Sequence, residues 1–428
     1  MVHNWGMGTL RLPGMLMTDH TIEVPLDHSR PDGPTIEVFA REVTAPDRDP
    51  ENLPWLLFLQ GGPGSGSPRP VRAEGWIATA LQRFRLLLLD QRGTGRSSPV
   101  RAQTVRGRSP EELAAYLRFF RADSIVADAE LLRRRVAGGR PWHTLGQSYG
   151  GFVTLTYLSQ APDALSACYV TGGLAPLSAT ADEVYARAYR RVQEKVSGFY
   201  ARYADDGPAI RRIVEHLAAT DVRLPDGDRL TVERFQTLGH GFGMRDGYER
   251  LHWLVEDAWA GDELSDAFLC HVMVATGYVD GPLYATLHES IYAQQGHATK
   301  WSAQRVRSDL GTFESDVDPV PLTGEMIYPW MFRDISLLRP FAGAADILAD
   351  VDDWPDLYDP AVLARNTVPV AAVVYHDDMY VDAQHSLGTA RAIPNTRVWV
   401  TNEWQHDGLR VSGGAVLSHL LSLHELNP

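Results

Sequence analysis

Short apolar runs that alternate with helical stretches constrain the fold of this chain most. The runs at 54–60 (PWLLFLQ) and 84–91 (FRLLLLDQ) are continuous rather than alternating, as in strands that are buried on both faces. A third run at 141–147 (PWHTLGQ) leads into a stretch that is expected to be a helix ending near Pro162. Strand and helix thus alternate from 54 to 173, which predicts an α/β fold with a mostly parallel sheet.

Two further local patterns flank these runs. Residues 20–44 carry two alternating stretches on either side of SRPDGP, which predicts an antiparallel hairpin. Residues 109–139 form one helical stretch, for which Pro110 is a suitable start and Gly138-Gly139 a suitable stop. We therefore expect one long helix between the second and third buried strands.

A long helical region interrupts the strand pattern. From 178 to about 340 the chain consists of amphipathic stretches rich in Tyr, Trp, Arg and Glu, with no convincing buried strand. The run at 368–376 (VPVAAVVYH) restores the buried-strand pattern, and 396–406 (TRVWVTNEWQH) gives a last strand before a final helix. The predicted organisation is one α/β domain, residues 1–177 and 363–428, split by a helical insertion, residues 178–362.

Charge, cysteine content and the length of apolar runs limit the kinds of partner and the cellular compartment that this chain is expected to have. The net charge of −14 repels phosphate backbones, which argues against nucleic acid. The two cysteines, Cys168 and Cys270, lie in apolar stretches without metal-ligand spacing and are expected to be buried free thiols. The N-terminus lacks a secretory pattern, and no apolar run approaches the roughly 20 residues that span a bilayer. A cytoplasmic protein without a membrane partner is expected, and its oligomeric state stays open.

The segment GQSYGG (146–151) places Ser148 in a G-x-S-x-G pattern between a predicted strand and a predicted helix. Small residues on either side allow the sharp turn that lifts a nucleophilic serine hydroxyl clear of the backbone. Such a turn also puts the serine at a helix N-terminus, where N–H groups favour developing negative charge. The alternative is a plain glycine-rich turn, but the strand before it and the helix after it favour a nucleophile.

A second glycine-rich segment, LQGGPGSG (59–66), follows the first buried strand. A flexible loop there lets the backbone N–H of Gly62, together with that of Tyr149, form an oxyanion hole. The alternative is a simple strand-to-helix turn. A phosphate cradle is less favoured, because no lysine follows at the P-loop position.

A serine nucleophile needs a base and an orienting carboxylate. In enzymes with a G-x-S-x-G elbow the acid follows the serine and the histidine comes last. His406 lies just beyond the last strand and is the best candidate base, ahead of His376 and His385, while His419 and His424 lie in the final helix. The acid should follow the 368–376 strand, where position alone leaves three candidates open: Asp377, Asp378 and Asp382.

The segment LLLLDQRGTGRSS (86–98) carries Asp90 and Arg92 at the end of a strand. We interpret them as a charge pair with a turn that shapes the floor of the site. Taken with QGGPGSG and GQSYGG, this segment resembles the proline iminopeptidase (prolyl aminopeptidase) family of α/β-hydrolases, which are serine peptidases. The resemblance is specific for residues 54–175, good for 368–410 and loose in the insertion.

The resemblance implies an α/β-hydrolase fold, a helical cap over the active site, and no metal or organic cofactor. It implies a peptide substrate with a free N-terminus, from which one residue, typically proline, is removed. Carried over residue by residue, Ser148 is the nucleophile, His406 the base and Asp378 the best-aligned acid, with Asp377 and Asp382 as alternates. The backbone N–H groups of Gly62 and Tyr149 supply the oxyanion hole. One departure is Gln60, where the family usually has histidine.

The family also implies cap glutamates that hold the charged terminal amine. Glu289 matches the family's cap glutamate followed by an aromatic residue, and Glu325 and Glu256 are the next candidates. The alternative is that these glutamates are solvated side chains on amphipathic helices. Competing functions are an esterase or amidase with the same catalytic residues and, from another class, a non-catalytic binding protein.

Overall fold

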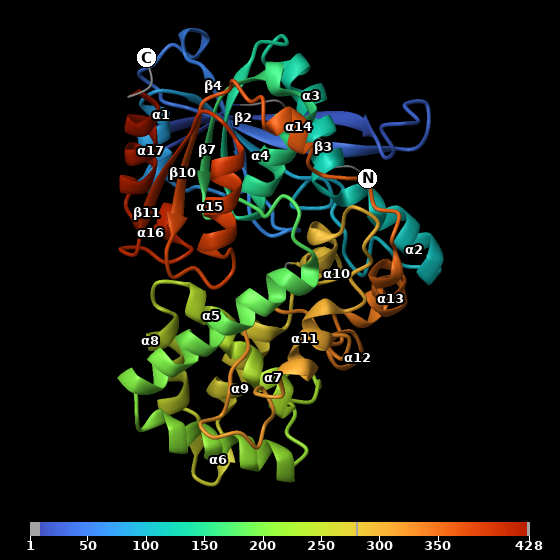
Figure 1. Cartoon of the computed structure of the whole chain (residues 1–428), viewed down its shortest axis with the longest axis vertical. Helices are drawn as coiled ribbons and strands as arrows, with labels where there is room; N and C mark the ends of the chain where they lie inside the picture. Colours follow the sequence, from blue (N-terminus) through green and yellow to red (C-terminus); the bar gives the residue numbers. More distant parts are fainter. Residues whose placement is uncertain (1–8, 280, 426–428) are drawn as a thin grey trace.

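The computed structural model describes residues 9–279 and 281–425, and a nine-stranded sheet forms its centre (Figure 1). The strand order is β1-β2-β3-β5-β4-β6-β7-β10-β11. The strands are β1 (Leu10–Leu12), β2 (Met15–Pro25), β3 (Thr35–Thr44), β4 (Trp55–Leu59), β5 (Arg85–Asp90), β6 (Trp142–Gln147), β7 (Leu165–Thr171), β10 (Val370–Tyr375) and β11 (Thr396–Thr401).

The sheet is antiparallel at one edge and parallel through the rest. The pairs from β1 to β5 are antiparallel, and the β2–β3 pair confirms the predicted hairpin. From β5 to β11 every pair is parallel. Strand β10 pairs with β7, although about two hundred residues lie between them in sequence, and β11 pairs with β10. This pairing confirms the predicted α/β fold with an insertion.

Helices cover both faces of the parallel part, which explains the continuous apolar runs. Leu56 and Phe58 of β4 pack in one cluster with side chains of α1 (Gly75–Leu81) and α17 (Ala415–Glu425). Their neighbours Leu57 and Leu59 pack in the other cluster with α3 (Ala122–Val136) and α4 (Tyr149–Gln160). Successive strand residues point to opposite faces, so a strand buried on both must be apolar throughout. Two short helices complete the core, α15 (Ala383–Ala392) and α16 (Gly408–Val411).

The single helix predicted over 109–139 is wrong, because the stretch forms two helices. Helix α2 (Pro110–Leu117) and a 3-10 turn (Arg118–Phe120) precede α3, and the backbone at Arg121 is extended. The side chain of Arg121 is buried and donates hydrogen bonds to three backbone carbonyls, those of Ser290, Ala293 and Pro355. The break lets this guanidinium leave the helix path and satisfy those carbonyls.

The insertion is mostly helical, with a two-stranded ribbon of β8 (Trp259–Ala260) and β9 (Glu263–Leu264) and an irregular segment at 311–330 that carries Glu325. Its helices are α5 (Ala181–Arg202), α6 (Asp206–Ala219), α7 (Val232–Gln236), α8 (Gly247–Glu256), α9 (Asp266–Thr276), α10 (Pro282–Leu287), α11 (Ser302–Leu310), α12 (Met331–Asp334), α13 (Ala342–Asp350) and α14 (Pro360–Leu363). Helices α5 to α9 lie below the sheet domain in Figure 1, whereas α13 packs against α2 and α14 against α4.

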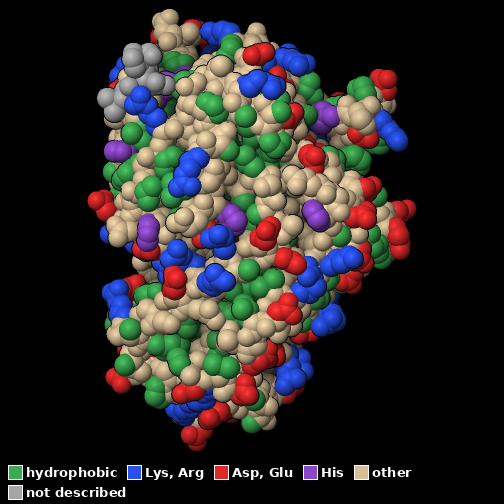
Figure 2. Space-filling model, viewed as in Figure 1, with side chains coloured by type: hydrophobic (Ala, Val, Ile, Leu, Met, Phe, Trp, Pro, Cys, Tyr) green, Lys and Arg blue, Asp and Glu red, His purple; other side chains and the backbone are tan. Residues whose placement is uncertain are grey.

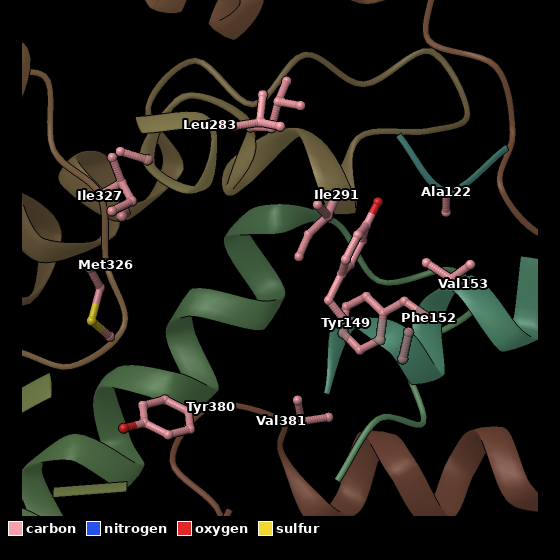
Figure 3. Close-up of a cluster of buried hydrophobic side chains, with 14 of the residues drawn as sticks. Ala122, Tyr149, Phe152, Val153, Leu283, Ile291, Met326, Ile327, Tyr380 and Val381 are labelled. Carbon is pink, nitrogen blue, oxygen red and sulfur yellow. The ribbon is translucent and has the colours of Figure 1, made fainter. Parts of the chain in front are cut away.

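Apolar side chains from the core and the insertion meet in one cluster. Figure 3 shows Tyr149 of α4 extending towards Ile291, with Phe152 beside Tyr149 and with Met326 and Ile327 further along the same cluster. The ring of Phe152 also makes an edge-to-face contact with Tyr292. The insertion is therefore packed onto the sheet domain rather than tethered to it.

The surface carries both signs of charge, with acidic and basic side chains interspersed over the face shown in Figure 2. Of the two free cysteines Cys168 is buried, as predicted, but Cys270 is exposed on α9, so that expectation was wrong for one of them. The burial pattern of α9 explains the error, because only three of its side chains face the interior. No described helix is long and apolar enough to cross a membrane.

Candidate active site

Ser148 lies in a strained turn between β6 and α4. Its backbone has φ 55° and ψ −124°, a conformation that residues other than glycine rarely adopt. A Cβ at Gly146 would lie 2.4 Å from the carbonyl oxygen of Gly150, and a Cβ at Gly150 would lie 1.9 Å from that of Leu59. Only glycine fits at these positions, which is the geometry expected of a nucleophile elbow.

The glycine loop after β4 lies directly beside this serine. A Cβ at Gly61 would lie 3.0 Å from Ser148 Cβ and 3.6 Å from Ser148 Oγ. Gly62 has φ 137°, which favours glycine, and Tyr149 is the first residue of α4. The carbonyl of Gln60 accepts a hydrogen bond from Gln91 Nε2 at 2.8 Å, so the DQRGTGRS segment supports the loop.

Asp378 and His406 form a buried pair beyond the ends of β10 and β11. His406 Nδ1 lies 2.7 Å from Asp378 Oδ2, and both side chains are almost fully buried. The other carboxylate oxygen, Oδ1, accepts from the backbone N–H groups of Tyr380 at 2.9 Å and Val381 at 3.1 Å. The carboxylate is thus held in one orientation, with one oxygen left for the imidazole.

The two other candidate acids have different partners. Asp377 lies 2.8 Å from His376 Nδ1, and both side chains are more than one third exposed. Asp382 accepts from the backbone N–H groups of Gln384 and His385, each at 3.0 Å, and caps α15. Of the three aspartates, the structure brings only Asp378 to His406.

Two glycines after β7 lie between the serine and the histidine. A Cβ at Gly172 would lie 3.1 Å from His406 Nδ1, and one at Gly173 would lie 2.4 Å from the carbonyl oxygen of Ser148. The backbone N–H of Ser148 donates to the carbonyl of Thr171 at 2.9 Å. The structure therefore gathers Ser148, Gly61, Asp378 and His406 at the carboxyl ends of the parallel strands.

The charge state of His406 follows from its neighbours. Burial alone would lower the pKa of the imidazole, but the charge and hydrogen bond of Asp378 outweigh burial and raise it. The Glu325 carboxylate acts in the same direction. A base whose protonated form is stabilised in this way can accept a proton from a serine hydroxyl.

Glu325 lines a cavity of about 620 Å³ that borders the glycine loop after β4. The cavity wall includes Ser65 and Gly66 of the glycine loop, with His240 and Tyr284 from the insertion. Tyr284 Oη donates to Glu325 Oε1 at 2.8 Å, and His240 Nε2 lies 3.9 Å from the same oxygen. Burial would raise the pKa of Glu325, yet His240, His288 and His406 together lower it to about 2. The carboxylate is therefore ionised and partly open to the cavity.

The other two predicted glutamates lie elsewhere. Glu289 is buried, and its carboxylate accepts from the backbone N–H groups of Ser302 at 3.0 Å and Ala303 at 2.8 Å at the start of α11. Glu256 is exposed at the end of α8 and does not line the cavity. Of the three, the structure brings only Glu325 to the cavity beside the glycine loop.

Sequence reasoning misses His240, because nothing in LGHGFG (238–243) points to a functional histidine. The predicted charge pair of Asp90 with Arg92 is wrong: Asp90 pairs with Arg69, and Arg92 pairs with Asp128. Asp90 and Arg92 are thus each paired with a residue from another segment of the chain. Among residues 9–279 and 281–425, no group of three or more His, Cys, Asp or Glu side chains is arranged to hold a metal ion.

The sheet and the serine turn define an α/β hydrolase, and residues 54–213 match the family model described as the alpha/beta hydrolase fold. A proline iminopeptidase of Aeromonas sobria is 48% identical over 96% of this chain and 97% of its own length. A proline iminopeptidase of Aspergillus aculeatus is 34% identical over 96% of this chain and 95% of its own length. The chain belongs to the proline iminopeptidase family.

Two further similarities are weaker. A proline iminopeptidase of Neisseria gonorrhoeae is 29% identical over 29% of this chain and 34% of its own length. Among solved structures, an esterase from Thermogutta terrifontis is 13% identical, with a TM-score of 0.43 and coverage of 96% of this chain and 100% of that one.

Proposed function

We propose that this chain is a serine prolyl aminopeptidase, which releases an N-terminal proline from peptides through an acyl-enzyme. The observation that carries the proposal is the buried Asp378–His406 pair beside the strained Ser148 turn. Membership of the proline iminopeptidase family supports proline as the released residue. The two free thiols, Cys168 and Cys270, support a cytoplasmic location, because free thiols persist in reducing compartments.

In the proposed reaction, Asp378 orients the His406 imidazole through the bond to Nδ1, which leaves Nε2 to take the Ser148 proton. The serine oxygen attacks the carbonyl carbon of the first residue and forms a tetrahedral oxyanion. The backbone N–H groups of Gly62 and Tyr149 stabilise that charge. His406 then protonates the leaving amine, and a water molecule, deprotonated by the same histidine, hydrolyses the acyl-enzyme.

The substrate's charged N-terminus is proposed to pair with Glu325. Its carboxylate is ionised, partly exposed and adjacent to the glycine loop, so an ammonium group can reach it. Glu289 already accepts two backbone hydrogen bonds at the start of α11, which supports a structural role for it. Glu256, at the exposed end of α8, has no geometric support as an amine ligand.

Replacing the nucleophile tests the assignment. Ser148→Ala should abolish cleavage of proline arylamide and labelling by a fluorophosphonate probe, while circular dichroism and Tm stay close to the parent values. The mutation of another serine to alanine, Ser418→Ala in the final helix, is the matched control. Near-parental hydrolysis by a folded Ser148→Ala protein would contradict the proposed mechanism.

A further inference from the structure

Helix α5 of the insertion carries three basic residues spaced by four, Arg187, Arg191 and Lys195. Residues at this spacing lie on one face of a helix. Each reaches a different residue of the sheet domain: Arg187 Nη1 lies 3.5 Å from Asp382 Oδ1, and Arg191 Nη1 lies 3.9 Å from Asp377 Oδ1. Lys195 Nζ donates to Gln405 Oε1 at 2.6 Å.

The residues that this row contacts flank the candidate acid and base. Asp377 immediately precedes Asp378, and Gln405 immediately precedes His406. The row therefore links one helix of the insertion to the loops 376–382 and 402–407, which extend from two different strands of the sheet.

Lys195 is the member of the row with the least exposure to solvent. It is 9% exposed, and burial lowers the pKa of its ammonium group, while the carboxylates of Asp377 and Asp378 oppose that shift. Its backbone carbonyl accepts a hydrogen bond from Tyr248 Oη at 2.6 Å, which fixes this turn of α5 within the insertion. A buried ammonium with a defined acceptor specifies the position of that acceptor more strongly than an exposed ion pair does.

A second segment of the insertion, residues 240–245, contacts the same two loops. The backbone N–H of His406 donates to the carbonyl of Gly243 at 3.1 Å, and that of Arg245 donates to Asp407 Oδ1 at 3.2 Å. Tyr380 Oη donates to the carbonyl of His240. The loop of His406 is thus bound by the insertion on both its main chain and its side chains.

We propose that Lys195 is a positioning residue for catalysis, which holds Gln405 from the insertion and so keeps His406 aligned with Asp378. Arg187 and Arg191 extend the same row to the loop of the acid. The inference rests on the proposed catalytic roles of Asp378 and His406, and it gives the insertion a part in the chemistry beyond covering the substrate. A 1 Å misplacement of a catalytic group costs about 10²-fold in rate, so a lost contact one residue from the base should be measurable.

The test compares Lys195→Met, Gln405→Ala and the double variant. Methionine preserves the volume of the buried stem but cannot donate the hydrogen bond. We expect each single variant to lower kcat for proline arylamide about tenfold, with KM nearly unchanged, and to slow fluorophosphonate labelling of Ser148 by a similar factor. If the Lys195–Gln405 bond is the cause, the double variant should be no slower than the slower single variant.

The matched control is Arg202→Met, because Arg202 lies on the same helix but pairs with Glu249 inside the insertion. Its kcat and labelling rate should equal those of the parent. Unchanged kcat and labelling in folded Lys195→Met and Gln405→Ala, or multiplied effects in the double variant, would overturn the proposal. Gln405→Ala tests the contact from the core side if Lys195→Met does not fold.

The labelling rate separates this proposal from the proposed function. It reports the reactivity of Ser148 whatever substrate the enzyme cleaves. A parent protein that is labelled but does not cleave proline arylamide would contradict the aminopeptidase function and leave the role of Lys195 intact.

Discussion

The Ser148 turn and the Glu325 cavity both border the glycine loop after β4, but they are built in different ways. The turn is assembled from β6, α4 and the loop after β4, and its shape depends on glycines for which no other side chain has room. The cavity is assembled largely from segments of the insertion, where Glu325, Tyr284 and His240 meet by tertiary packing. The proposed nucleophile, acid and base thus all belong to the sheet domain, whereas the proposed recognition of the amine depends on how the insertion packs onto it.

Two glutamates of the insertion, Glu289 and Glu325, also differ in their surroundings. Glu289 is buried and Glu325 is partly exposed; burial raises the pKa of Glu289 to about 7, whereas surrounding histidines lower that of Glu325 to about 2. The first accepts hydrogen bonds from the backbone N–H groups of Ser302 and Ala303, and the second lines a cavity. The environment, rather than the residue type, decides which of them is available to a ligand.

The largest expected effect comes from replacing the proposed catalytic acid in the sheet domain. Asp378→Asn should lower kcat about 10³- to 10⁴-fold, because the amide cannot hold the His406 imidazole in the required tautomer. The loss should be equal for proline arylamide and for a small ester without an amine. Asp377→Asn is the matched control, and a comparable loss there would reassign the acid.

Replacing Glu325 in the cavity should affect only substrates that carry a free amine. Glu325→Gln should lower kcat/KM for proline arylamide about 10- to 100-fold, because a charge-assisted hydrogen bond to the ammonium group is lost. Hydrolysis of the small ester should be unchanged at a pH above the acid limb of its profile. Equal losses for both substrates would show that Glu325 belongs with the chemistry, and Glu256→Gln serves as the surface control.

Glu289→Gln should change stability more than activity. The raised pKa means that folded protein binds this proton more tightly than unfolded protein does, so the residue's contribution to stability falls as pH rises from about 4.5 to about 7. The difference in unfolding free energy between parent and variant should change by about 3 kcal/mol across that window, with the variant gaining relative to the parent. Urea titrations at pH 4.5 and 8 measure it, and a constant difference would argue against the raised pKa.

The smallest expected effect tests whether the charge of Glu325 influences His406. His406 must be neutral to act as a base, so kcat/KM should fall as pH drops through its raised pKa, above the ordinary histidine value. Because Glu325 contributes to that rise, Glu325→Gln should move the acid limb to lower pH by a fraction of a unit, about 0.5 or less. The ester is the better substrate for this measurement, because it has no amine to bind Glu325. An acid limb at the same pH in parent and variant would mean that the Glu325 charge does not affect the pKa of His406.

The sequence by itself determined the parallel sheet, the break for the insertion and the serine turn. These features are local: a strand buried on both faces must be apolar along its whole length, and the turn at Ser148 leaves no room for a Cβ at Gly146, which would meet the carbonyl of Gly150. Such constraints act between neighbours in the chain, so they leave a pattern that can be read without the fold.

Only the tertiary structure decided among residues of the same type. Asp377, Asp378 and Asp382 lie within six residues, and what separates them is that the loop turns one carboxylate towards His406 and another into the cap of α15. Glu289 and Glu325 differ in the same way, and the break at Arg121 depends on carbonyls far along the chain. Most of these partners are distant in sequence, as His406 is from Asp378, so they come together only once the chain has folded.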